Sequence, residues 1–222
     1  MNKKTDTSSL KYNVQLSFGE EVGNVITHGV MALLLVISLP FVAIHAYISG
    51  GMVLATGTSI FILSLFFMFL SSALYHAMDF NSKHKYIFRI LDHIFVYVAI
   101  AGTYTPVALY VIGGTTGYIL LAIQWGCVLA GIFYKSLAQK SIKGLSLAIY
   151  LIMGWIAVLF LPTLLAKTSP LFLGLILFGG ISYSIGAWFY TQKTRPYFHM
   201  IWHLFINLAS ILHFIAIVFF IQ

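Results

Sequence analysis

The chain has 222 residues, of which 60% are hydrophobic, 16% are aromatic and only 8% are charged. Soluble proteins average about 25% charged residues, so this composition excludes an ordinary soluble globular fold. The net charge of +7 is spread over short loops beside apolar segments and forms no concentrated basic face. We therefore expect no nucleic-acid partner, and we attribute the charge to membrane topology and attraction to anionic lipids.

Seven apolar runs follow one another along the chain, each about 19 to 25 residues long, enough for a helix to cross a hydrocarbon core of roughly 30 Å. They cover residues 24–48, 53–77, 88–112, 117–135, 145–166, 170–190 and 199–221. The first run follows Glu20 and Glu21 and lacks a small-x-small cleavage site, so we do not expect a cleaved signal. The sequence predicts an all-α membrane protein, with a tail over residues 1–23 and a seven-transmembrane helix bundle over residues 24–222.

The distribution of basic residues predicts the orientation of the bundle. Eleven of the 12 lysines and arginines lie in the N-terminal tail and in the second, fourth and sixth loops between runs: Lys3, Lys4, Lys11, Lys83, Lys85, Arg89, Lys135, Lys140, Lys143, Lys193 and Arg195. Only Lys167 falls on the other side. Because basic loops stay in the cytoplasm, we expect a cytoplasmic N-terminus and an external C-terminus.

The first run begins with the stretch "EEVGNVITHG", which carries polar residues at the cytoplasmic end of the expected helix. Glu21, Asn24 and His28 fall at positions i, i+3 and i+7, on one stripe of the helix. One interpretation is an N-terminal cap with acidic residues at the positive end of the helix dipole, which we favour for Glu20. The other is that Glu21, Asn24 and His28 line the cytoplasmic mouth of a cavity, and the sequence leaves both open.

Two later runs bring polar residues to the same level of the membrane. The second run ends "FLSSALYHAM", with Ser72 and His76 on one face, and the third begins "FRILDHIFVY", with Asp92 about one turn inside the cytoplasmic boundary. Polar groups inside a membrane are costly and usually face the bundle interior and pair with one another. Their common depth therefore predicts a shared site.

The seventh run adds two histidines to this level. It begins "PYFHMIWHLF", which places His199 and His203 one helical turn apart on one face. Three histidines with a carboxylate are typical of a catalytic zinc site, where three protein ligands leave a position for water. We expect His76, His199 and His203 to bind zinc. Asp92 either binds the metal directly or holds its water as a base, and Ser72 hydrogen-bonds that water or orients a ligand.

The remaining polar residues have simpler interpretations. A lone histidine near a helix end usually reaches the interface or caps a carbonyl, which fits His45 and His84. His93 is expected to point about 100° away from Asp92, and His213 to bond between helices. Ser71 is expected to bond its own helix. Haem is disfavoured, because two ligands four residues apart on one helix cannot reach opposite faces of a haem.

The third run contains a proline that bears on the shape of the bundle. Pro106, preceded by Gly102 and Thr103, is expected to bend the helix beyond Asp92. Such a bend can widen the bundle and open a cavity that reaches from the zinc site into the membrane.

The motifs "SALYH", "LDHIFVYVAIAGTYTP", "HMIWH" and "EEVGNVITHG" together resemble the haemolysin III family, the bacterial branch of the progestin and adiponectin receptor family. The resemblance covers nearly the whole chain. It implies that His76, His199 and His203 bind zinc and that Asp92 and Ser72 lie near the metal water. It also implies a wider link to alkaline ceramidases, which are intramembrane zinc amidases, and a location in the bacterial cytoplasmic membrane.

Three functions are compatible with these features. The first is a zinc-dependent intramembrane hydrolase of lipid amides or esters that acts in membrane lipid homeostasis, with membrane lipids as partners and a lipid substrate or ligand in the bundle cavity. The second is a non-catalytic, zinc-stabilised membrane sensor or receptor-like regulator. A cytolytic pore-former ranks last, because no run has a polar stripe along its full length.

Overall fold

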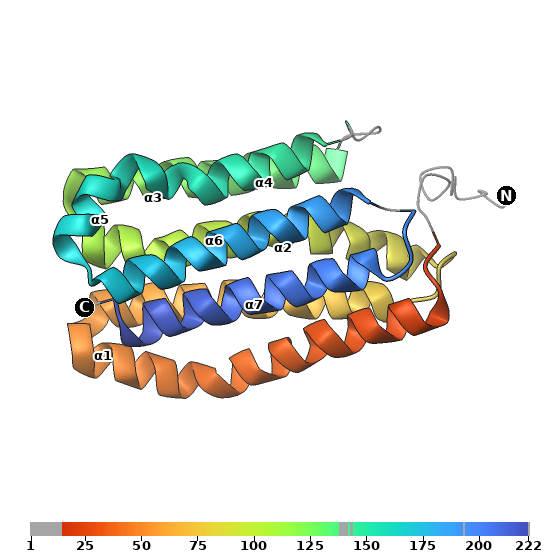
Figure 1. Ribbon diagram of the computed structural model, residues 1–222, viewed down its shortest axis with the longest axis horizontal. Helices are drawn as coiled ribbons and strands as arrows, with labels where there is room; N and C mark the ends of the chain where they lie inside the picture. The colour runs from red at the N-terminus through yellow and green to blue at the C-terminus, as the bar shows by residue number, and fades with distance from the viewer. Residues whose placement is uncertain (1–14, 138–141, 143, 193, 222) are drawn as a thin grey trace, which may run out of the picture.

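The computed structural model describes residues 15–137, 142, 144–192 and 194–221, which form one helical bundle (Figure 1). Its elements are α1 (Phe18–Ala77), α2 (Lys83–Pro106), η2 (Val107–Ile112), α3 (Gly114–Leu137), α4 (Leu145–Trp155), η3 (Ile156–Phe160), α5 (Leu161–Lys167), α6 (Pro170–Thr191) and α7 (Phe198–Phe219). Within the described ranges no β-strand occurs, and six helical stretches are long and apolar enough to cross a membrane. The prediction of an all-α membrane protein is confirmed.

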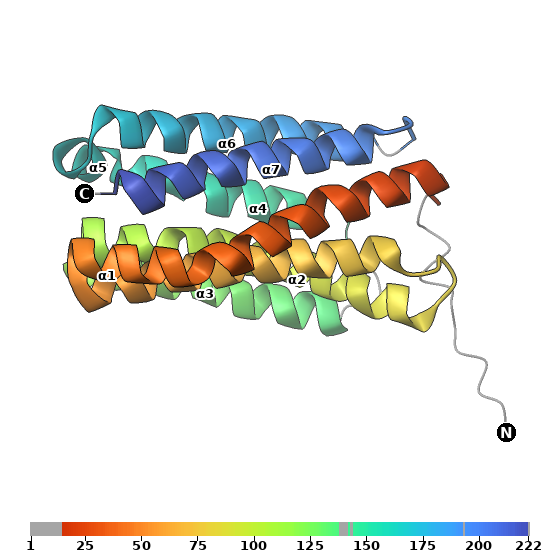
Figure 2. The same ribbon diagram turned by 90° about the horizontal axis from the view of Figure 1, so that it is seen from below.

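The first two predicted runs are joined in α1, which folds back on itself. Gly50 and Gly51 interrupt its helical backbone, and Gly51 has a φ of 69°, a conformation that favours glycine. A straight helix of 60 residues would be about 90 Å long. Instead, Asn24 Nδ2 lies 3.4 Å from His76 Nδ1, so the two ends of α1 meet. We call residues 18–49 the first arm and residues 52–77 the second arm; both views show them running back along each other (Figures 1 and 2).

Different segments of the chain lie at the two ends of the bundle. One end, which we call the histidine end, holds the start and finish of α1, the start of α2 and the start of α7 (Figure 1). The opposite end, which we call the Gly50 end, holds the turn of α1 and the short helix α5. The predicted site residues of α1, α2 and α7 therefore lie at the same end of the bundle.

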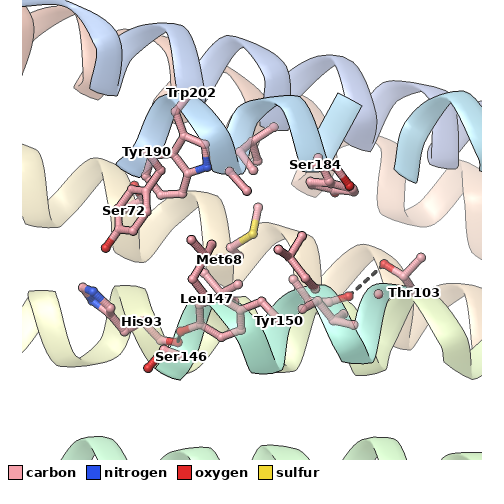
Figure 3. A pocket seen from close by; sticks show the side chains of 18 of the residues that line it. Met68, Ser72, His93, Thr103, Ser146, Leu147, Tyr150, Ser184, Tyr190 and Trp202 are labelled. Atoms are coloured by element: carbon pink, nitrogen blue, oxygen red, sulfur yellow. Dashed lines mark hydrogen bonds between the residues drawn. The ribbon is translucent and has the colours of Figure 1, made fainter. Parts of the chain in front are cut away.

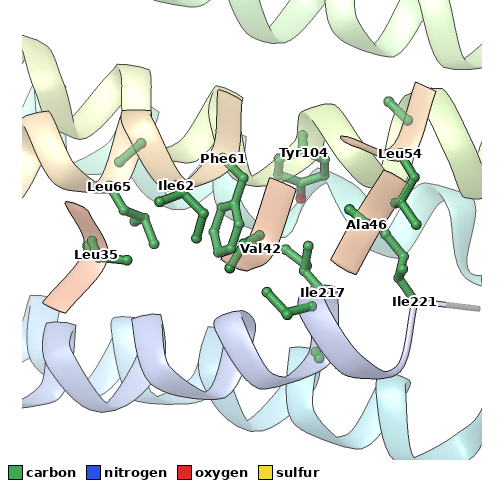
Figure 4. Packing of buried hydrophobic residues seen from close by; sticks show 14 of the residues in the cluster. Leu35, Val42, Ala46, Leu54, Phe61, Ile62, Leu65, Tyr104, Ile217 and Ile221 are labelled. Atoms are coloured by element: carbon green, nitrogen blue, oxygen red, sulfur yellow. The ribbon is translucent and has the colours of Figure 1, made fainter. Parts of the chain in front are cut away.

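An apolar core fills the space between the arms of α1 and the second half of α7. Val42, Phe61 and Ile62 are fully buried there and pack with Leu65 and Ile217 (Figure 4). In a membrane such packing stabilises the bundle through close van der Waals contact, since lipid tails are as apolar as the side chains. This core fixes α7 against α1, the two elements that carry the predicted zinc ligands.

The third and fifth predicted runs are both irregular. Pro106 ends α2, and the chain continues as the π-helical segment η2, because proline cannot donate the helical hydrogen bond. The fifth run breaks between α4 and η3. There the hydroxyl of Tyr104 donates to Gly154 O at 2.7 Å and accepts from Ala157 N at 2.9 Å. A side chain of α2 thus supplies the hydrogen bonds that the break removes.

A cavity of about 1670 Å³ runs along the bundle between α2, α4, α6, α7 and the second arm of α1. His76, Asp92 and His199 line it at the histidine end, and Leu164 and Phe172 line it towards the Gly50 end. Typical small-molecule pockets measure roughly 300–1,000 Å³. The cavity is therefore large enough for a lipid-sized molecule.

Candidate metal centre and cavity

Three histidines converge at the histidine end. His76 lies in the last turn of α1, and His199 and His203 lie in the first two turns of α7. The Nε2 atoms of His76 and His199 are 3.2 Å apart, and one nitrogen from each of the three rings lies within 4.8 Å of the others. His203 is fully buried; among the described residues neither ring nitrogen makes a hydrogen bond of regular geometry, and the backbone of Asn24 is a hydrogen-bonding group beside the ring.

These observations fit a zinc ion. Imidazole nitrogens bind zinc at about 2.0–2.1 Å in a tetrahedron, which places two ligand nitrogens roughly 3.3 Å apart. The separation of 3.2 Å between His76 and His199 is close to that value. A neutral imidazole carries one N–H and one lone pair, and a metal ion takes only the lone pair. The backbone of Asn24 lies beside the ring of His203 and can accept its N–H, which leaves the other ring nitrogen for a metal.

The carboxylate of Glu21 fixes the ring of His76. Its Oε2 lies 2.5 Å from His76 Nδ1, and its Oε1 accepts a hydrogen bond from Lys85 Nζ at 2.6 Å. A carboxylate on one imidazole nitrogen orients the ring and leaves the other nitrogen available for a metal. The sequence left open whether Glu21 belongs to the helix cap or lines the mouth of a cavity. The structure shows that it lines the cavity and also holds His76.

Of the two residues that share the stripe with Glu21, His28 lines the cavity and Asn24 does not. Asn24 is fully buried and contacts His76 instead of the cavity. His28 stacks on His203, with ring centroids 3.6 Å apart and planes at 5°, and meets the edge of Phe69. These contacts hold the plane of the His203 ring.

Asp92 and Ser72 line the cavity beside the histidines. Asp92 is 9% exposed, and its Oδ2 lies 3.7 Å from His93 Nδ1. Among the described residues, the group of converging nitrogens consists of the three histidines and does not include Asp92. Ser72 is 2% exposed and lies beside Asp92, to whose carboxylate its hydroxyl can donate.

Several minor predictions can also be compared with the structure. His93, expected to point about 100° away from Asp92, lines the cavity (Figure 3), and Tyr150 donates its hydroxyl to His93 O at 2.7 Å. Its Nδ1 lies 2.7 Å from Arg89 O on its own helix. The helix-bonding role of Ser71 is confirmed by its hydrogen bond to Met68 O.

The start of α7 is also held by the first arm. Tyr197, just before the helix, has a φ of 63° and donates its backbone N–H to Glu20 Oε1 at 2.5 Å. Glu20 forms a capping box with Ser17 as well, which confirms the expected cap. The adjacent residues Glu20 and Glu21 therefore contact α7 and His76 respectively, and this tandem role was not predicted.

Lys85 is a second residue that sequence reasoning missed. It is 3% exposed, and it bonds both Glu21 and the carbonyl of Met78. A possible signal was its spacing from Arg89 and Asp92, since positions 85, 89 and 92 share one helix face. The choice of Glu21 as its partner depends on helix packing.

The fold and this geometry define a class: an integral, multi-pass helical membrane protein with a three-histidine cluster at one end of a large cavity. A family model described as "Haemolysin-III related" matches residues 16–214, which is most of the chain. The chain belongs to the haemolysin-III-related family.

Curated relatives support the assignment. The "Hemolysin-3 homolog" of Bacillus subtilis (strain 168) is 39% identical over 201 residues, covering 90% of this chain and 94% of the relative. "Hemolysin-3" of Bacillus cereus is 36% identical over 202 residues, covering 91% and 92%. The human "Monocyte to macrophage differentiation factor" is 28% identical over 158 residues, covering 68% and 64%. No solved structure matches the chain.

Proposed function

We propose that this protein is a zinc-dependent intramembrane hydrolase that cleaves an amide or ester bond of a membrane lipid and acts in lipid homeostasis. The observation that carries the proposal is the position of the histidine cluster. Its ring nitrogens converge beside a cavity that Asp92 and Ser72 also line.

His76, His199 and His203 would hold the zinc, and Glu21 would orient the first of them. Bound there, zinc would polarise the carbonyl group of the lipid and activate a water molecule for hydrolysis. The oxygen of that water joins the acyl carbon, and the bond to the leaving nitrogen or oxygen breaks.

Asp92 moves the proton in this scheme. Its carboxylate accepts the proton that the water loses and returns it to the leaving amine or alcohol, which is general base and general acid catalysis by one residue. Ser72, which lies beside Asp92, orients the water or the carbonyl through its hydroxyl. The apolar remainder of the cavity receives the acyl chain and excludes bulk water.

We also propose seven membrane spans in the bacterial cytoplasmic membrane, with the two arms of α1 counted as separate spans. The N-terminus and the histidine end face the cytoplasm, and the C-terminus faces outside. The distribution of the basic residues supports this orientation, since among the lysines and arginines that the structure describes only Lys167 lies near the Gly50 end. Reporter fusions after Lys11, Gly50, Lys140 and Gln222 should read in, out, in and out. A cytoplasmic C-terminus would contradict it.

The experiment that tests the proposal combines metal analysis with lipid analysis. Purified wild-type protein should contain about one zinc per chain, as three histidine ligands predict. It should also release a fatty acid from a membrane lipid amide or ester, detected by mass spectrometry. A His199→Ala, His203→Ala double variant should lose both properties. Wild-type protein without zinc would contradict the metal centre.

A non-catalytic sensor is the second candidate, and one observation favours it. The histidines belong to two elements far apart in the chain, so a metal would join the second arm of α1 to α7 whether or not a reaction follows. If the wild-type protein binds zinc but releases no fatty acid from any lipid amide or ester, the hydrolase is excluded and the sensor is retained.

A further inference from the structure

Three ionisable side chains share one face of α2 at the histidine end. Lys85, Arg89 and Asp92 are spaced by four and three residues, and all of them line the cavity. Lys85 pairs with Glu21 and Asp92 lies near His93, whereas Arg89 has no ion-pair partner in the described part of the chain. This difference indicates which kind of ligand would bind in the cavity.

Lys85 is fully engaged by the protein. Its Nζ donates to Glu21 Oε1 at 2.6 Å and to Met78 O at 3.1 Å, and it lies 5.0 Å from the ring centre of Tyr75. With 3% of its surface exposed, it has little access to any ligand. Lys85 therefore holds Glu21, the residue that contacts His76.

Arg89 lies between this ion pair and Asp92. Its Nη1 atom is buried and has no hydrogen-bond partner in the part of the chain that the structure describes. Within the same part, no carboxylate oxygen lies within 4.0 Å of its guanidinium group. A buried guanidinium N–H without an acceptor is unfavourable, because the group loses its water and gains nothing in return.

Few acidic groups are available to Arg89. Among the described residues that line the cavity, the carboxylates are those of Glu21 and Asp92. Glu21 is already bonded to His76 and Lys85, and Asp92 has no oxygen within 4.0 Å of the Arg89 guanidinium group. Arg89 therefore favours an anion in the cavity.

Beyond Arg89 the cavity becomes apolar, with Val96 and Ile100 of α2 facing Leu173 and Ile176 of α6 as lining residues. A ligand that fits both parts is an amphiphile with an oxyanion at one end. The planar fork of arginine matches two oxygens of a phosphate or carboxylate, a geometry that lysine cannot reproduce.

We propose that Arg89 binds the anionic headgroup, a phosphate or a similar oxyanion, of the lipid whose chain occupies the cavity. The inference rests on the proposed function, because that lipid is the substrate; it adds that the substrate class is anionic. Arg89 is then the residue that selects the headgroup, and the chain beyond it extends towards the Gly50 end.

The test is a binding measurement on the zinc-loaded full-length protein in a neutral detergent. Short-chain phosphatidylglycerol, a short-chain diacylglycerol with the same chains and no phosphate, and inorganic phosphate are titrated separately by calorimetry. We expect wild-type protein to prefer phosphatidylglycerol over the diacylglycerol. Arg89→Gln should weaken phosphatidylglycerol binding about 10- to 100-fold, the range expected for a lost charge-assisted hydrogen bond, and leave diacylglycerol binding unchanged. Arg89→Lys keeps the positive charge but not the planar fork. Its affinity for phosphatidylglycerol should lie between those of the wild type and the Arg89→Gln variant.

The matched control is Arg195→Gln, an exposed arginine at the same end that contacts the ring of Phe198 and does not line the cavity. It should bind like the wild type. Equal binding of the two lipids by wild-type protein, or an equal loss in the Arg195→Gln variant, overturns the inference. If inorganic phosphate binds as tightly as the lipid, and only when Arg89 is present, the ligand of Arg89 is free phosphate and the assignment to a lipid headgroup is wrong. If Arg89→Gln does not fold, equal binding by Arg89→Lys and wild type still contradicts the role of the fork.

Measurements on the same protein samples test the hydrolase proposal and the Arg89 proposal separately. Zinc quantification and fatty-acid release report on the hydrolase, whereas the lipid preference requires no turnover. A protein that binds zinc and hydrolyses lipids without a headgroup preference contradicts only the role of Arg89. A headgroup preference in a protein without zinc contradicts only the metal centre.

Discussion

The two halves of α7 each bury a histidine, and the two histidines differ in their surroundings. His213, in the half towards the Gly50 end, is 9% exposed; its Nε2 donates to Ile176 O of α6 at 3.1 Å, and its ring meets the edge of Tyr183. His203, in the other half, is fully buried; neither nitrogen makes a hydrogen bond of regular geometry among the described residues, and the backbone of Asn24 lies beside the ring. Burial alone therefore does not distinguish a ligand from a structural histidine.

The distinguishing feature is the position of the second ring nitrogen, since a neutral imidazole has one N–H and one lone pair. His213 gives its N–H to a backbone carbonyl, and the absence of a side chain at Gly179 makes room for its ring. The expectation that His213 bonds between helices is confirmed. His203 is instead stacked on His28, and one of its nitrogens converges with those of His76 and His199. Only His203 of the two therefore belongs to a group that could hold a metal ion.

The largest expected effect concerns zinc itself. His203→Gln should reduce the zinc content from about one per chain to nearly none, because two remaining histidines do not form a stable site. His213→Gln is the matched variant on the same helix, and it should keep its zinc. Metal quantification by mass spectrometry on both proteins measures this. Zinc loss in both variants would show that His203 and His213 do not differ in their importance for zinc binding.

The next effect concerns the chemistry beside the cluster. Asp92→Asn should keep its zinc but lower fatty-acid release on the order of 10²–10⁴-fold, since the amide keeps the shape and removes the base. Asp79→Asn, an exposed acidic residue in the neighbouring turn, is the control and should retain activity. If Asp92→Asn protein loses its zinc, Asp92 is a direct ligand and the three-histidine site is incomplete.

A smaller effect is expected from the residue that orients His76. Glu21→Gln should weaken zinc binding about 10- to 100-fold, the usual cost of losing a carboxylate behind a metal-bound imidazole. Competition with a metal-binding dye gives the affinity, and the absorption spectrum of the cobalt-substituted protein reports the ligand geometry. Lys85→Met should show a weaker change in the same direction. Wild-type affinity and spectrum in the Glu21→Gln variant would show that the contact is only structural.

The sequence predicts the members of the site better than their contacts. The spacing of His199 and His203, together with the order of the runs, is enough to bring them to one end with His76. The bond between Glu21 and Lys85 joins residues 64 positions apart and depends on how each helix is rotated. Likewise, the sequence cannot show which backbone groups lie beside the rings of His203 and His213, because that also depends on how each helix is rotated.

The smallest effect on the metal site is expected from a substitution that disturbs the packing of His213. Such a substitution should change the stability of the protein but not its zinc content. A Cβ atom added at Gly179 would overlap the His213 ring, so Gly179→Ala should lower the free energy of unfolding by about 1–3 kcal/mol, the range for overpacking in a core. Its zinc content should not change, because His213 is ten residues beyond His203 on α7. Gly126→Ala in α3 is the matched control: no atom lies within 4 Å of the added carbon, and its stability should change by less than about 0.5 kcal/mol. Denaturation in detergent, followed by circular dichroism, gives both values. Zinc loss in Gly179→Ala protein with unchanged stability would mean that the two halves of α7 are coupled through the metal and do not act separately.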